Sequence, residues 1–74
     1  MKKFATAYVS LFENNAIAQV FEAENEIAAM KMAILSNQKD EYTREWIEGM
    51  TDLTVEQFKD EILQGEQSVD AIEI

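Results

Sequence analysis

Apolar and polar residues near the N-terminus alternate with the two-residue period of a β-strand. Residues 4–12 and 17–21 are rich in aromatic and β-branched side chains, which suit the pleated surface of a sheet. Asn14 and Asn15 fall between these runs, and asparagine tolerates the left-handed backbone that a two-residue hairpin turn needs. The pattern therefore predicts one β-hairpin over residues 3–23.

Pairing around this turn places Tyr8 opposite Phe21 and defines two faces, because successive side chains of a strand point to opposite sides. One face carries small and branched residues: Ala5, Ala7, Val9, Leu11, Ala18 and Val20. The other face is aromatic and carries Phe4, Tyr8, Phe12, Ile17 and Phe21. Neither face is polar, whereas an antiparallel sheet usually presents one polar face to water.

The aromatic face of the hairpin requires a cover, and the sequence leaves three candidates. The protein's own helices can pack on it, with the alanine-rich face packing elsewhere. A second copy can pair with it in a two-fold dimer, the commonest oligomer, or a different protein can bind it. Its five residues are therefore a candidate partner or dimer face.

Two helices are predicted after the hairpin. The first covers residues 25–36, where apolar residues recur at helical spacing behind Asn25 as N-cap. The second covers residues 40–48, with Asp40 as its cap and Gly49 as its stop. The second has the weaker signal, because it also contains residues that favour strands.

The third helix carries the clearest local signal in the chain. Thr54 and Gln57 form a capping box, and Gly65 marks the end of the helix. Residues 68–74 then read as a short strand with enough charge to lie at a sheet edge. The order β-β-α-α-α-β predicts an α+β fold: one domain over residues 1–74, with a three-stranded antiparallel sheet, its last strand beside the first, and helices on one face.

Charge is distributed unevenly along the chain. Residues 1–39 hold four acidic and four basic side chains, whereas residues 40–74 hold eleven acidic and two basic ones, so the whole net charge of −9 lies in the second half. This distribution disfavours direct binding to nucleic-acid phosphates or to an anionic membrane surface. A basic protein surface is the partner that the charge favours.

The residue types present argue against an enzyme. The chain has no His and no Cys, so its serines lack the partners of a nucleophilic site, and no acidic run matches a calcium loop. No metal site or cofactor is expected. No apolar run approaches the ~20 residues of a membrane helix, and the lack of Cys suits the reducing cytoplasm.

Two further groups of residues are candidate recognition sites. Asp52, Glu56, Asp60 and Glu61 are predicted to form an acidic patch, with a solvated, solubilising face as the alternative interpretation. Tyr42 and Trp46, four residues apart, are a candidate aromatic anchor. Their alternative role is to cover one end of the core.

The segment from Lys2 to Ala33, with its string VFEAENEIAAMKMA leading from a strand into an alanine-rich helix, resembles the opening of many small phage-encoded, host-directed proteins. The resemblance extends over less than half of the chain and assigns no functional residue. It implies a host-takeover or anti-defence protein that works by binding.

The sequence thus favours a small, acidic, non-enzymatic protein that binds another protein as an inhibitor of a host factor or as an adaptor. One alternative is a nucleic-acid mimic, in which the acidic patch blocks a DNA- or RNA-binding protein. A second alternative is a structural homodimer whose sheet faces form one shared core.

Overall fold

The computed structural model describes residues 1–11 and 15–74. Its elements, in chain order, are β1 (Lys2–Ser10), β2 (Asn15–Ala23), α1 (Glu26–Asn37), α2 (Glu41–Glu48), α3 (Val55–Gln64) and β3 (Gln67–Glu73). The predicted α+β fold and the order β-β-α-α-α-β are confirmed. The uncertain second helix is present, and its bounds lie within one residue of those predicted.

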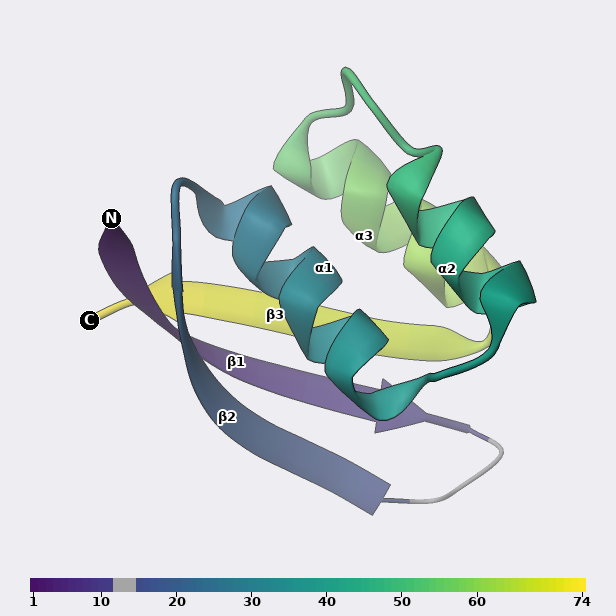
Figure 1. Cartoon of the computed structure of the whole chain (residues 1–74), viewed down its shortest axis with the longest axis horizontal. Coiled ribbons are helices and arrows are strands. Elements are labelled where there is room, and N and C mark those ends of the chain that lie inside the picture. The colour runs from purple at the N-terminus through teal and green to yellow at the C-terminus, as the bar shows by residue number, and fades with distance from the viewer. Residues whose placement is uncertain (12–14) are drawn as a thin grey trace.

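The three strands form one antiparallel sheet in the order β2-β1-β3, so that β3 lies beside β1 as predicted. All three helices lie on one side of this sheet (Figure 1). Helix α1 contacts all three strands, α3 contacts β3, and α2 packs against α1. Among the described residues, the opposite side of the sheet carries no helix. The strand order leaves β2 and β3 as the two edges.

The pairing of β1 with β2 differs from the predicted register. Phe4 lies opposite Phe21 and Tyr8 opposite Ile17, whereas the turn predicted at Asn14 and Asn15 would put Tyr8 opposite Phe21. The predicted turn is wrong at Asn15, which is a strand residue paired with Ser10. Asn14, the other half of that turn, lies outside the described residues, as do Phe12 and its predicted pairing.

The assignment of the described strand side chains to the two faces is nevertheless correct. The observed and predicted registers differ by four residues, and an even shift leaves each side chain on its own side of the sheet. The structure also shows why the observed register is better. In the predicted register Phe4 would lie opposite Asn25, beyond the end of β2, whereas in the structure it packs opposite Phe21.

The core lies between the helices and the aromatic side of the sheet. Met30 and Ile34 from α1, with Phe58 and Ile62 from α3, are fully buried there. Ala29 and Ala33 are also completely buried, and their small side chains let α1 approach the strands closely. Burial of large apolar side chains at about 25 cal/mol per Å² is the main stabilising term of such a core.

The helix N-termini are formed by the residues that the sequence indicated. The Asn25 side chain accepts a hydrogen bond from the backbone N–H of Ala28 at 2.8 Å, and Thr54 and Gln57 form both bonds of the capping box. Asp40 accepts from the N–H of Thr43 at 2.8 Å, and this hydrogen bond holds the pKa of the Asp40 carboxyl below its ordinary value. Each side chain satisfies an otherwise unpaired N–H group.

Candidate interaction surfaces

The aromatic side of the hairpin is interior and is covered by the protein's own helices. Phe4 and Tyr8 are only 2% and 1% exposed, and Ile17 and Phe21 are half-buried against the same core. Phe12, the fifth member of this candidate face, lies outside the described residues. For these four residues the prediction of a partner or dimer face is therefore corrected. A partner could reach Phe4 and Tyr8 only if the core opened.

Tyr8 is fixed by polar contacts as well as by packing. Its hydroxyl donates a hydrogen bond to Oε1 of Gln67 at 2.6 Å and accepts one from Nε2 of Gln38 at 3.0 Å. The three residues come from β1, β3 and the segment after α1, so one buried hydroxyl joins the sheet to the helical layer. A buried phenol needs such partners, which identifies Tyr8 as a structural residue.

The opposite side of the sheet is open and apolar, and we call it the open face. Its members are Ala5, Ala7 and Val9 from β1, Ala16, Ala18 and Val20 from β2, and Ile72 from β3. Leu11, which follows β1, and the large residues Val20 and Ile72 are between 57% and 66% exposed. Its charged or polar members are Lys3, Glu22 and Ser68 near the ends of their strands, and Asp70 on the edge strand β3 opposite Ala7.

The open face is hollowed where its side chains are smallest. A shallow depression of about 190 Å³ runs along Ala5 and Ala7 and is bordered by Asp70 and Ile72. Alanines in the middle and larger apolar residues around them give the face a concave profile. Such a surface can receive the apolar side chains of another molecule.

Sequence reasoning gave the open face no site residue, although it identified the two faces of the hairpin. A signal was present in the relative size of the two sets of side chains. Aromatic residues bury far more area than alanines, so the helices gain more by packing on the aromatic side. Because the three helices cover only one side of the sheet, the alanine-rich side stays uncovered.

A second depression lies between α2 and the end of α3. It has a volume of about 350 Å³ and is lined by Tyr42, Trp46, Glu61 and Gly65, among others. Tyr42 is 82% exposed, whereas Trp46 is half-buried and packs against the core. The two residues share one side of α2 as predicted, but Trp46 covers the end of the core and only Tyr42 is freely accessible.

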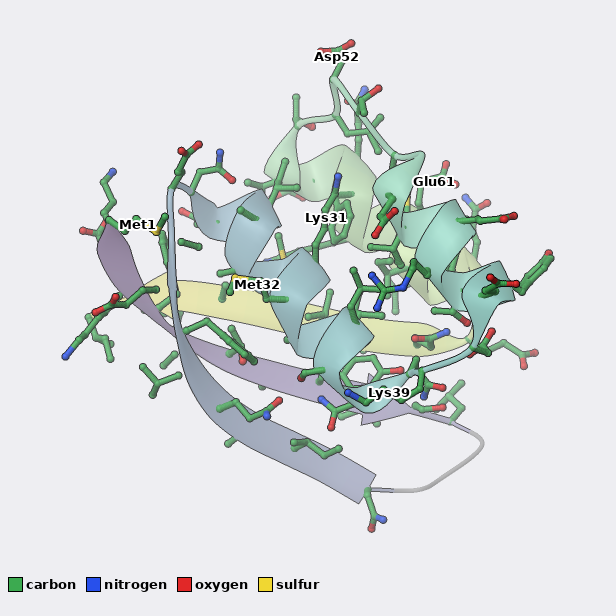
Figure 2. The ribbon with its side chains drawn as sticks, in the orientation of Figure 1. Met1, Lys31, Met32, Lys39, Asp52 and Glu61 are labelled. Carbon is green, nitrogen blue, oxygen red and sulfur yellow. The ribbon has the colours of Figure 1, made fainter. Side chains whose placement is uncertain are left out.

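The four residues of the predicted acidic patch are all exposed but do not form one compact cluster. Asp52 lies at the tip of the loop before α3 (Figure 2), where its backbone adopts the left-handed region with φ of 59°. Glu56 and Asp60 follow on one side of α3. Glu61 instead borders the depression next to Tyr42 and Trp46 on α2.

One ion pair of the acidic half reaches across the edge of the sheet. Lys59 on α3 contacts Asp70 on β3 with Nζ and Oδ1 2.8 Å apart, although Asp70 belongs to the open face. The same Asp70 oxygen accepts the backbone N–H of Ala71 at 2.8 Å. The hydrogen bond from Lys59, aided by that from Ala71, lowers the pKa of Asp70, and the bond to Asp70 raises the pKa of Lys59.

A carboxylate whose pKa is lowered is a weak base, so Asp70 beside the depression of the open face is poorly suited to proton abstraction. Over residues 1–11 and 15–74 no three acidic side chains converge as a metal site would require. Within the same ranges no helix is both long and apolar enough to cross a membrane.

Comparison with known proteins gives no relative for this chain. No protein-family model, no curated protein and no solved structure matches it.

Proposed function

We propose that the protein is a non-enzymatic binding protein that contacts another protein through the open face of its sheet. The observation that carries this proposal is the exposure of Leu11, Val20 and Ile72 around a hollow lined by alanines. The largest exposed apolar patch on a monomeric protein is often a functional site.

The size of the open face is consistent with that role. Three strands spaced about 4.8 Å apart, over some seven residues of about 3.3 Å rise each, give a footprint of roughly 330 Å². That area matches the largest patch of a typical monomer, which is often functional. It is less than half of the ~800 Å² that each partner buries in a standard interface, so the partner must also contact neighbouring parts of the molecule.

The helical layer lies on the opposite side of the sheet from the open face, but its charge acts at long range on a partner that approaches the molecule. Residues 40–66 contain nine acidic side chains, all exposed, and two basic ones. A partner whose apolar ridge is bordered by basic residues would match both the open face and this charge. As an inhibitor of a host factor or as an adaptor in the cytoplasm, the protein would act by occupying such a surface, in keeping with its resemblance to phage-encoded proteins.

The proposal is tested by affinity capture from lysate of the cells that carry the gene, with wild-type protein and the variant Ala7→Lys. Ala7 lies in the middle of the open face, opposite Ala18 on β2 and Asp70 on β3, so a lysine there places a charge in the hollow beside a carboxylate that can pair with it. We expect a specific protein to be captured by the wild type and lost with Ala7→Lys. Capture of the same protein by both would contradict the proposal.

A second candidate function rests on the acidic layer alone. In this alternative the exposed carboxylates of the second half mimic nucleic-acid phosphates and block a DNA- or RNA-binding protein. The triple variant Glu56→Gln, Asp60→Asn and Glu61→Gln removes three of them without changing the open face. Loss of capture with the triple variant and retention with Ala7→Lys would favour mimicry, and the reverse result would exclude it.

A further inference from the structure

The two edges of the sheet differ in their protection. An unprotected edge strand presents a row of free N–H and C=O groups that can pair with another chain, and proteins usually block it with charges, prolines or covering segments. Within residues 1–11 and 15–74, strand β3 has such protection and strand β2 does not.

The edge of β3 is blocked by charge. The Asp70 carboxylate occupies the N–H of Ala71 at 2.8 Å, and Lys59 extends from α3 to the same carboxylate. Since Lys59 comes from the helix side and Asp70 belongs to the open face, this ion pair spans the strand edge. An incoming strand would have to break both contacts.

The backbone groups on the free edge of β2 can be identified from the pairing. Leu11 donates its N–H to the carbonyl of Glu66, and the carbonyl of Lys3 accepts from the N–H of Ile74. The backbone N–H and C=O groups of odd-numbered residues in β1 therefore point toward β3. The backbone N–H and C=O groups of even-numbered residues in β1 point toward β2, where they pair with those of odd-numbered residues. The backbone N–H and C=O groups of Ala16, Ala18 and Val20 consequently point away from β1, outward from the free edge of the sheet.

The side chains along this edge offer no obstacle. From Asn15 to Phe21 the strand has no charged residue and no proline, and Glu22 is the first charge. Ala16 and Ala18 are small, so a second backbone can approach closely. In Figure 1 β2 forms the outer border of the sheet, on the side away from α2 and α3.

The distribution of charge permits pairing between two copies of this chain along β2. The chain carries a net charge of −9, but residues 1–39, which include β1, β2 and α1, are neutral overall. Two copies that meet along β2 keep their acidic helices α2 and α3 at the far ends, where repulsion is weakest. An antiparallel pairing of β2 with β2 is also self-complementary, as a two-fold dimer requires.

We propose that the protein forms a homodimer in which the free edge of β2 pairs antiparallel with β2 of a second copy, near Ala18. The result is a continuous six-stranded sheet with all helices on one side. A single strand edge is a small interface, so we expect dissociation in the micromolar range. The dimer does not depend on the proposed function. It would join two open faces into one apolar surface of roughly 650 Å², close to the ~800 Å² that each partner buries in a standard interface.

Sedimentation velocity from about 1 to about 200 µM, a range that brackets weak self-association, tests the dimer directly. We expect the wild type to shift toward twice its mass of 8.5 kDa. Ala18→Pro removes an N–H that points away from the sheet, so it should keep the fold and abolish the shift. Ala7→Lys changes the open face without changing the free edge of β2, so this variant should still dimerise. A wild type that stays monomeric throughout, or a dimer lost with Ala7→Lys and kept with a folded Ala18→Pro, would overturn the proposal.

Cysteine cross-linking gives a second test that holds even where Ala18→Pro fails to fold, because the chain has no cysteine of its own. In the proposed dimer the two copies of residue 18 lie about 5.5 Å apart, within reach of a disulfide. The two copies of residue 7 are separated by three strand spacings, about 14 Å, which is too far. Oxidation should therefore link Ala18→Cys and not Ala7→Cys. Efficient linkage through residue 7, or none through residue 18, would contradict edge pairing.

Discussion

The indole ring of Trp46 lies directly against Gly65, so that a Cβ atom added to Gly65 would be 2.5 Å from the ring carbon Cη2. Gly65 ends α3 with φ of −85°, an angle that any residue can adopt. Glycine is needed here because the ring occupies the space of a side chain. This contact couples the position of α2 to the end of α3.

We therefore expect Gly65→Ala to lower the free energy of unfolding by about 1–3 kcal/mol, the usual cost of overpacking. Trp46 is the sole tryptophan, so its fluorescence should report the displaced ring. Denaturant unfolding followed by circular dichroism measures the loss. In a Trp46→Leu background the same change should cost much less, and an equal cost in both backgrounds would show that the ring is not the cause.

The residue after Gly65 is the one with a left-handed backbone. Glu66 has φ of 63°, and its carbonyl accepts a hydrogen bond from the N–H of Leu11 at 3.2 Å. A left-handed conformation costs a residue with a side chain about 1–2 kcal/mol, part of which glycine recovers. Glu66→Gly should raise the free energy of unfolding by about 0.5–1 kcal/mol.

Glu66→Ala is the matched control for that prediction. It removes the same charge and side chain but keeps a Cβ atom, so it should give no comparable gain. If both variants stabilise the protein equally in denaturant unfolding, then charge relief and not backbone strain is responsible.

These two adjacent residues illustrate how far local sequence signals reach. Gly65 was correctly assigned to the end of a helix, since glycine there is a strong stop signal. Its physical reason, the ring of Trp46, depends on a contact between residues far apart in the chain. The left-handed angle of Glu66 has no sequence signal at all, because glutamate is an unusual residue for it.

The hairpin shows the same limit at the level of the sheet. Alternation correctly placed Phe4 and Tyr8 on one side and the alanines on the other, since it depends only on odd and even positions. The register has no such signal, because any even shift preserves the two faces. Packing under the helices, which brings Phe4 opposite Phe21, selects among the registers.

Candidate sites were harder to predict than the fold. The aromatic residues were strong candidates because they are large and apolar, and for the same reason they form the core. The open face was missed because alanine is a weak signal for an interface. The asymmetry between the two sheet edges depends on the Lys59 to Asp70 contact, which is visible only in three dimensions.

The ion pair between Lys59 and Asp70 should make stability depend on pH in a defined window. Because the folded pKa of Asp70 is lowered, its contribution is present above the ordinary pKa of aspartate and is lost as pH falls through the folded value. Because the folded pKa of Lys59 is raised, its contribution is present below the ordinary pKa of lysine and is lost as pH rises through the folded value. The pair therefore stabilises the protein from mildly acidic to mildly alkaline pH.

Asp70→Asn should lower the free energy of unfolding at pH 7 by no more than about 1 kcal/mol, because both side chains are partly exposed. The difference from the wild type should shrink in acid. Urea unfolding at several pH values measures it. Asp60→Asn, which removes the same charge from the exposed surface of α3, should not lower stability at pH 7; equal losses in the two variants would argue against the ion pair.

Val20 and Phe21 are neighbours on β2 whose side chains point to opposite sides of the sheet. Phe21 packs against the core, whereas Val20 is 57% exposed on the open face. Phe21→Asp should therefore lower the free energy of unfolding by at least about 2 kcal/mol, since it removes apolar packing and brings a charge to the core. Val20→Asp should cost well under half as much. Denaturant unfolding at a concentration well below the micromolar dissociation constant expected for the dimer measures both; similar losses would mean that Val20 is also buried, and that the open face is not open.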